Sequence, residues 1–138
     1  MEQAGGYEYR LDALKKALTD FEQSLKLDLA EFDVVARDVI KNGQIQKFEI
    51  CVELFWKTLQ KFLIDIHGID TASPKKTVKE FFRVGYSQET TYERFIDMIN
   101  DRNRLSHIYN ETQFNEIYEQ ITDYLRHMKS AVREIEAA

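Results

Sequence analysis

The sequence is poor in residues that interrupt helices or cross-link chains. It has one proline and five glycines among 138 residues, too few for a collagen-like or low-complexity chain. The single cysteine, Cys51, excludes an intramolecular disulfide and a cysteine metal knuckle. No strictly apolar run exceeds three residues, whereas a membrane-spanning helix needs about 20. Residues 1–6 lack the basic and apolar regions of a signal peptide, so we expect a cytoplasmic protein without a membrane partner.

Basic side chains are also in the minority. There are 19 lysines and arginines against 24 acidic residues, which gives a net charge of −5, so a general electrostatic attraction to nucleic acid is not expected. Residues 72–86 differ, because they hold one acid and four bases. The ordinary interpretation of this run is a solvated helix face, although a polyanion would meet a local basic patch there. The four bases are Lys75, Lys76, Lys79 and Arg83.

Apolar residues recur at intervals of three and four along most of the chain. Examples are the stripes that begin at Leu11, at Ile45 and at Phe114, and this spacing is typical of amphipathic helices packed lengthwise. Extended alternation with a period of two is absent, so a sheet is not expected. We predict an all-α, up-and-down four-helix bundle with short additional helices, forming one domain over residues 1–138. The expected helices cover 8–27, 30–41, 44–67, 74–84, 90–106 and 111–136.

Helix boundaries are predicted from a few residues. Asn42–Gly43 is expected to separate two helices, Gly68 to end one, and Ser73–Pro74 to begin the next. Capping-box spacing marks two further helix starts, at Thr90 with Glu93 and at Asn110 with Gln113. The many aromatic residues, with nine phenylalanines and seven tyrosines, exceed what a small core needs. Some of them are expected to form the contact face of a homodimer.

The three histidines lack the spacing of a metal site. The residues three positions before His67, His107 and His127 are not glutamates, so the Glu-x-x-His pairs of di-iron bundles are missing. A glycine-rich phosphate loop is missing as well, and we expect neither a metal nor a cofactor. His67, in the last turn of a helix, and His127, four residues after Asp123, are interpreted as structural.

The segment 101–109 carries the densest group of chemically useful side chains. It continues an apolar helix stripe, which would place Arg102, Asn103 and Ser106 close to that face. Arg102 and His107 are five residues apart, about 140° around a regular helix. They would converge only if the helix ended or bulged near Ser106, or through copies from a second subunit. Asn103 is four residues from His107 and within reach of its imidazole.

Histidine is a general acid and base near neutral pH, and arginine binds phosphate. Together they suit metal-free cleavage of RNA, in which the 2′-hydroxyl attacks the adjacent phosphate. The ordinary interpretation, a hydrogen-bonded helix end, stays open at this point. A row at Glu49, Glu53 and Lys57 is interpreted as surface ion pairs, with a place in a cleft or partner contact as the alternative.

Arg102-x4-His107 in an all-helical chain resembles the HEPN superfamily, and the trailing Tyr109 resembles its HepT-type members. Those members are encoded beside a minimal nucleotidyltransferase and are often labelled nucleotidyltransferase substrate-binding proteins. The resemblance spans residues 8–135. It extends to a second-helix pattern of Gln46-Lys47-Phe48-Glu49, Glu53-Leu54, Trp56-Lys57 and Leu59.

The resemblance implies a homodimer whose motifs face each other in a cleft, acting as a metal-independent ribonuclease toxin on RNA such as tRNA or mRNA. It implies catalytic roles for Arg102 and His107, with Asn103 and Ser106 in support. The partner nucleotidyltransferase, as antitoxin, would transfer AMP to Tyr109, whose added negative charge would repel RNA. Two alternatives remain: a non-catalytic subunit that presents a substrate to the nucleotidyltransferase, and a plain helical interaction protein.

Overall fold

The computed structural model describes residues 6–138, and this part of the chain is helical with no strand. The predicted all-α class is therefore confirmed. No helix among these residues is long and apolar enough to cross a membrane. The α-helices are α1 (Tyr7–Leu25), α2 (Val34–His67), α3 (Pro74–Arg83), α4 (Glu89–Arg104), α5 (Glu111–Tyr118) and α6 (Ile121–Ala137). Two short 3₁₀ turns, η1 (Leu29–Glu31) and η2 (Leu105–His107), complete the structure.

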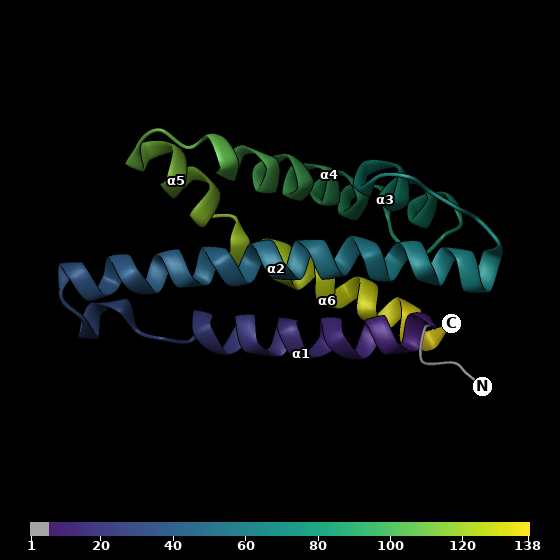
Figure 1. Cartoon of the computed structure of the whole chain (residues 1–138), viewed down its shortest axis with the longest axis horizontal. Coiled ribbons are helices and arrows are strands. Elements are labelled where there is room, and N and C mark those ends of the chain that lie inside the picture. Colours follow the sequence, from purple (N-terminus) through teal and green to yellow (C-terminus); the bar gives the residue numbers. More distant parts are fainter. Residues whose placement is uncertain (1–5) are drawn as a thin grey trace.

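Four helices, α1, α2, α4 and α6, form the bundle, and they alternate in direction along the long axis of the molecule (Figure 1). The 34-residue α2 runs through the middle and contacts α1, α3, α4 and α6. The shorter α3 packs against α2 and α4, while α5 connects the far end of α4 to α6 (Figure 1). The predicted up-and-down four-helix bundle with short additional helices is confirmed.

Aromatic rings from different helices meet in the core. Phe48 of α2 stacks on Tyr124 of α6 with ring centroids 5.8 Å apart, and Phe55 of α2 lies 4.9 Å from Phe95 of α4. All four side chains are almost completely buried. Each large ring removes much apolar surface from water, which is the main stabilising contribution of such a core. These contacts fix α4 and α6 against α2.

The predicted break at Asn42–Gly43 is wrong, because α2 continues through it from Val34 to His67. Asn42 turns its side-chain amide onto the carbonyl of Asp38, within the same helix. A glycine inside a helix costs only about 1 kcal/mol relative to alanine, and the buried residues that follow Gly43 outweigh that cost. The helix begins later than expected, at Val34, and the side chain of its N-cap residue Asp33 accepts a hydrogen bond from the Ala36 backbone N–H.

Other boundaries follow the sequence more closely. Gly68 caps α2 in the left-handed conformation with φ of 66°, and Pro74 occupies the first turn of α3.

Two other boundaries differ from the prediction. The predicted helix 111–136 is instead two helices, α5 and α6, separated by a turn at Glu119–Gln120. The apolar stripe keeps its helical spacing across this turn, so periodicity did not reveal it. Thr90 does not cap α4, which begins after Gln88.

Candidate functional site

The segment 101–109 lies where α4 ends and the chain turns toward α5. Arg102 occupies the last turn of α4, which tightens into the 3₁₀ turn η2 after Arg104. His107 is the last residue of η2, and Tyr109 follows in the loop before α5. The α-helix therefore ends near Ser106, which is where it would have to end for Arg102 and His107 to converge. The two side chains nevertheless make no hydrogen bond to each other within the described chain.

Arg102 turns toward α2. It lines an open hollow of about 420 Å³ together with residues of that helix. Its Nε atom is inaccessible to solvent and has no hydrogen-bond partner among residues 6–138. A buried N–H without an acceptor costs about 1–3 kcal/mol, so Arg102 holds one unsatisfied donor beside the hollow. The helix α2 contributes Gln46, Glu49, Ile50, Glu53 and Leu54 to the hollow.

Glu53 lines the same hollow, and its carboxyl interacts with the charge of this arginine. Partial burial opposes ionisation of Glu53, but hydrogen bonds from Lys57 and Trp56, together with the charge of Arg102, lower the pKa of its carboxyl. The Lys57 Nζ lies 3.0 Å from Glu53 and forms the expected ion pair along α2. Sequence reasoning left Glu53 outside the site, although its position beside the apolar stripe of α2 was a usable signal.

The polar residues between Arg102 and His107 are more exposed than the stripe predicted. Asn103 and Ser106 both face solvent rather than the apolar face. The Ser106 hydroxyl donates a hydrogen bond of 2.9 Å to the Asn103 carbonyl, so it closes the helix end. Within the part of the chain described, the Asn103 side chain makes no hydrogen bond to His107. The imidazole of His107 is itself exposed and free to meet a ligand.

Tyr109 projects into solvent, with 82% of its surface exposed. Its backbone is held all the same, because its N–H donates to the Gln113 side-chain oxygen at 2.8 Å. The Asn110 side chain accepts from the Gln113 backbone N–H at 2.9 Å and caps α5, as the sequence predicted. The loop thus presents a free phenol on a fixed backbone.

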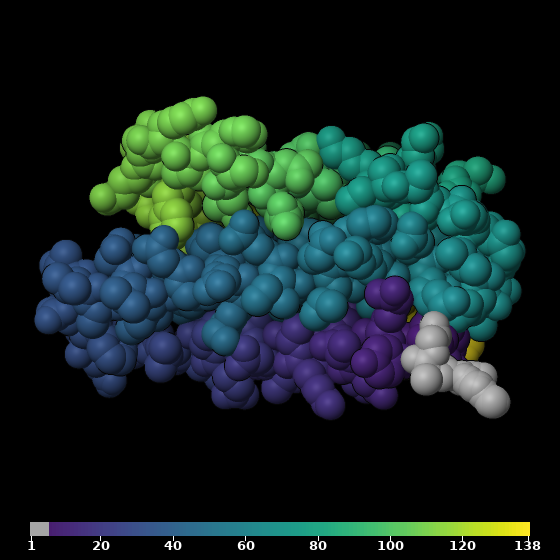
Figure 2. Space-filling model, viewed as in Figure 1, coloured from purple at the N-terminus to yellow at the C-terminus, as the bar shows by residue number. Residues whose placement is uncertain are grey.

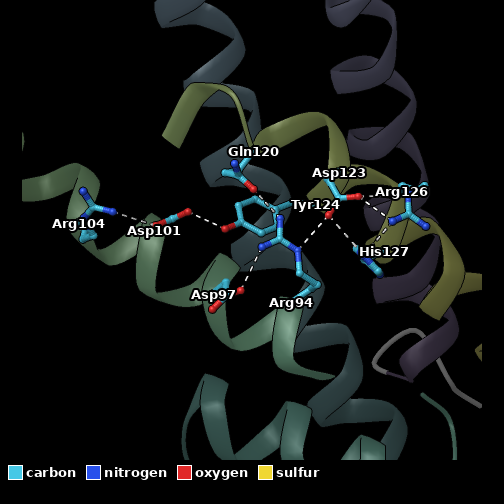
Figure 3. Close-up of polar contacts among 9 residues, drawn as sticks. All are labelled: Arg94, Asp97, Asp101, Arg104, Gln120, Asp123, Tyr124, Arg126 and His127. Carbon is cyan, nitrogen blue, oxygen red and sulfur yellow. Dashed lines mark hydrogen bonds and ion pairs between the residues drawn. The ribbon is translucent and has the colours of Figure 1, made fainter. Parts of the chain in front are cut away.

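A polar network beside the motif joins α4 to α6 (Figure 3), and it extends to α5. The Tyr124 hydroxyl donates to Asp101, which also pairs with Arg104, and Arg104 reaches Glu116 of α5 at 3.3 Å. Two turns earlier on α4, Arg94 binds three acceptors and lies 4.7 Å from the Tyr124 ring centroid. The acceptors are Asp97, Gln120 and Asp123. Most of these contacts join residues of different helices, so no local pattern could have revealed the network.

The other two histidines occupy structural positions. The His67 Nε2 lies 2.8 Å from the Tyr86 hydroxyl, in the last turn of α2. His127 pairs with Asp123 at 3.4 Å but is buried against the core rather than placed on the surface. Burial lowers the pKa of His127, as do the charges of Arg126 and Arg94, against an opposing effect of Asp123. Among residues 6–138, no group of three or more His, Cys, Asp or Glu residues is arranged to hold a metal ion.

Taken together, segment 101–109 offers a guanidinium with one unsatisfied donor, an exposed imidazole and an exposed phenol. A guanidinium can hold a phosphate, and an imidazole can move a proton near neutral pH. A phenol so exposed can accept a transferred group. Phosphate chemistry is therefore the class of reaction that these side chains suit.

Known proteins share this fold. A crystal structure from Thermus thermophilus has 29% sequence identity and a TM-score of 0.78, covering 88% of this chain and 98% of that one. A Haemophilus influenzae structure, described as the fold of a substrate-binding domain of a nucleotidyltransferase, has 24% identity and a TM-score of 0.76 and covers 91% and 98% of the two chains. No curated protein matches the sequence.

A third similar structure is a tri-AMPylated HEPN toxin from Shewanella oneidensis in complex with an MNT antitoxin. It has 12% identity and a TM-score of 0.75, with both chains fully covered, so the likeness is one of fold. A family model described as "Nucleotidyltransferase substrate binding protein like" matches residues 9–137. Since that match takes in almost the whole sequence, the chain belongs to the nucleotidyltransferase substrate-binding-protein-like family.

Proposed function

We propose that the protein is a metal-independent endoribonuclease of the HEPN type, a cytoplasmic toxin neutralised when a partner minimal nucleotidyltransferase transfers AMP to Tyr109. The observation that supports this most directly is the Arg102 side chain at an open hollow, five residues before the exposed imidazole of His107. A guanidinium at such a hollow can donate hydrogen bonds to a phosphodiester.

In the proposed reaction the RNA 2′-oxygen attacks the adjacent phosphorus. The bond from phosphorus to the 5′-oxygen breaks, leaving a 2′,3′-cyclic phosphate and a free 5′-hydroxyl. One imidazole accepts the proton of the 2′-hydroxyl, and a protonated imidazole gives a proton to the departing 5′-oxygen. Arg102 stabilises the negative charge that develops on the phosphate oxygens.

A homodimer fits this scheme, since one imidazole cannot be base and acid in the same step. A two-fold axis beside the motif would bring together both copies of His107 and of Arg102. The surface next to Arg102 suits such a contact, because the hollow on α2 includes the half-exposed Ile50. Asn103 and Ser106 would support the site by shaping the helix end from which His107 projects.

The exposure of Tyr109 supports its role as AMP acceptor. A phenol that is 82% exposed needs no unfolding to reach a second enzyme. The adenylyl group would place a phosphate two residues from His107, where its charge and bulk oppose an RNA backbone. The AMPylated toxin from Shewanella oneidensis, solved with its MNT antitoxin, has the same fold and lends the idea a precedent.

One alternative function also has support. The family description names substrate binding, and the Haemophilus influenzae structure is described as a substrate-binding domain of a nucleotidyltransferase. In that case the chain would hold a substrate for its partner and carry out no chemistry. The hollow beside Arg102 would then be the place of binding.

The deciding experiment incubates the purified protein with total RNA and tRNA in EDTA. Mass spectrometry of the intact chain first establishes that Tyr109 is unmodified. His107→Ala serves as the inactive variant, and His67→Ala, which changes a histidine at the end of α2, serves as the matched control. We expect cleavage by wild type and His67→Ala only. Equal cleavage by His107→Ala, or none by wild type, contradicts the proposal, and the second result favours the substrate-binding subunit.

A further inference from the structure

The helix α3 carries positive charge that the rest of the protein leaves unneutralised. Lys75, Lys76 and Lys79 lie on the surface of the molecule, and no acidic group of residues 6–138 forms an ion pair with them. Elsewhere on the surface, many lysines are paired at 2.6–3.2 Å with a carboxylate. These include Lys15 with Glu136, Lys57 with Glu53, Lys61 with Asp65 and Lys129 with Glu22.

The bases of α3 share one face. Its other face is buried through Thr77, Val78 and Phe81, which packs the helix onto the bundle. Lys76, Lys79 and Arg83 follow at intervals of three and four, so they form a stripe about 10 Å long. The same three side chains line a hollow of about 510 Å³ against the segment 69–72.

Two acidic residues also line this hollow, Asp70 and Glu80. Glu80 is already engaged, because Arg83 lies 3.2 Å from its carboxylate. Asp70 shares the hollow with two unpaired lysines, Lys76 and Lys79. The net charge of the residues that line the hollow is therefore positive. On a protein of net charge −5, a fixed concave patch of this sign is a docking place for a polyanion, since it attracts negative charge that the remaining surface repels.

The patch is connected to the motif through α4. Phe82 of α3 stacks on Tyr92 in the first turn of α4, with ring centroids 5.1 Å apart. Arg102 is ten residues further along α4, about 15 Å along the axis. In Figure 2 the teal surface of α3 and the green surface from the end of α4 lie along the same upper edge of the molecule. A strand of nucleic acid advances about 3.4 Å per nucleotide, so a segment of several nucleotides reaches from one to the other.

We infer that the α3 stripe, through its unpaired members Lys76 and Lys79, binds the phosphate backbone of RNA at a distance from the segment 101–109. This rests on the proposed function for the identity of the polyanion. It adds that the RNA substrate extends several nucleotides beyond the bond that is cut, far enough to reach α3. The contact is with phosphates, so it sets affinity and leaves the choice of base to the site near Arg102.

The test measures binding of a fluorescein-labelled 20-nucleotide RNA by anisotropy, in a His107→Ala background that prevents turnover. The variant is Lys76→Ala/Lys79→Ala. Its matched control is Lys16→Ala/Lys26→Ala, which removes two exposed lysines at α1, on the opposite side of α2 (Figure 1). Both variants lose two positive charges, so an effect of overall charge alone would be the same in each.

We expect the α3 variant to bind about tenfold more weakly at about 0.1 M salt, and its plot of log affinity against log salt to be shallower by about 1.4. The control is expected to keep wild-type affinity and slope. Equal affinity and slope for the α3 variant and its parent overturn the inference, as does an equal loss in both double variants.

The outcomes separate this inference from the ribonuclease proposal. RNA that binds through α3 but is never cleaved by the wild-type chain leaves the inference standing and removes the ribonuclease. An α3 variant that binds RNA normally but no longer binds the nucleotidyltransferase assigns the stripe to the partner protein and overturns the inference. In a cleaving wild-type background, the α3 substitutions should raise KM and leave kcat unchanged.

Discussion

Tyr124 on α6 donates a hydrogen bond of 2.6 Å to Asp101, the residue directly before Arg102 (Figure 3). Tyr124 is almost completely buried, and burial together with the neighbouring carboxylate raises the pKa of its phenol. The hydroxyl therefore stays protonated and keeps donating over the whole physiological range. One buried hydroxyl thus ties the last turn of α4, which carries the motif, to the neighbouring helix α6.

Replacing Tyr124 with phenylalanine should destabilise the protein by about 1.5–3 kcal/mol, because a buried hydrogen bond to a charged group is lost while the ring is kept. Urea unfolding measures this. The control is Tyr118→Phe, which removes a hydrogen bond to the neutral Gln44 side chain and should cost about 0.5–1.5 kcal/mol. A smaller loss of stability for Tyr124→Phe than for Tyr118→Phe would contradict a stabilising role for the hydrogen bond between Tyr124 and Asp101.

Arg102→Met should separate stability from activity. The arginine Nε makes no hydrogen bond that folding needs, and methionine keeps an unbranched apolar stem of similar reach. Thermal unfolding should show a free energy unchanged within about 0.5 kcal/mol, or raised, since a buried unsatisfied donor is removed. Cleavage of RNA should fall at least about 100-fold, as for loss of a donor to a developing oxyanion. A large loss of stability would instead assign Arg102 a structural role.

Gly43→Ala should stabilise the protein by about 0.5–1 kcal/mol, since alanine loses less conformational entropy in a helix. An added Cβ would meet nothing within 4 Å, and the residue lies inside α2. Gly68→Ala is the counterpart, because φ of 66° at that position is unfavourable for a residue with a Cβ. It should destabilise by about 1 kcal/mol. Denaturation midpoints of the two variants should move in opposite directions.

His127 should make the fold sensitive to mild acid. Its pKa is lowered in the folded state, chiefly by burial, so below its ordinary value of 6.5 the unfolded chain binds more protons than the folded chain. Stability should therefore fall as the pH drops from about 7 through the folded pKa of His127. The carboxyl of Asp123, whose pKa is also lowered, adds a further loss only below its ordinary 3.8.

The measurement is the free energy of unfolding between about pH 5 and 8 for wild type and His127→Gln. Glutamine keeps a polar side chain but does not titrate, so the slope with pH should become smaller in this window. An unchanged slope would mean that other groups set the pH dependence.

Helix type and core were predictable because burial follows a helical period over most of the chain. Leu14, Phe48 and Phe55 are all fully buried, as their stripes required. The predicted helix boundaries were wrong where burial of apolar residues outweighed a local preference, or where the apolar spacing continued across a turn. Gly43 stayed helical because buried neighbours outweigh its weak propensity, and the turn at Glu119–Gln120 was hidden because Ile117 and Ile121 keep their spacing across it.

The site was predictable only as a list of residue types. Spacing placed Arg102 and His107 on one helix end, and the helix does end near them. Their surroundings depend on contacts between distant segments, such as Arg102 beside Glu53 on α2 or Asp101 bound to Tyr124 on α6. A single sequence records no such pairs, so the orientation of Arg102 toward α2 could not be derived from it.

The capped loop at Tyr109 separates any regulation there from the stability of the fold. Its backbone is held by Gln113 on one side, and its phenol stands clear of every packed surface. A group added to that ring need not disturb a helix or expose the hydrophobic core, so the modified and unmodified proteins should unfold at the same temperature. The two forms would then differ only in which ligands can reach segment 101–109, and both would be equally resistant to the proteases of the cell.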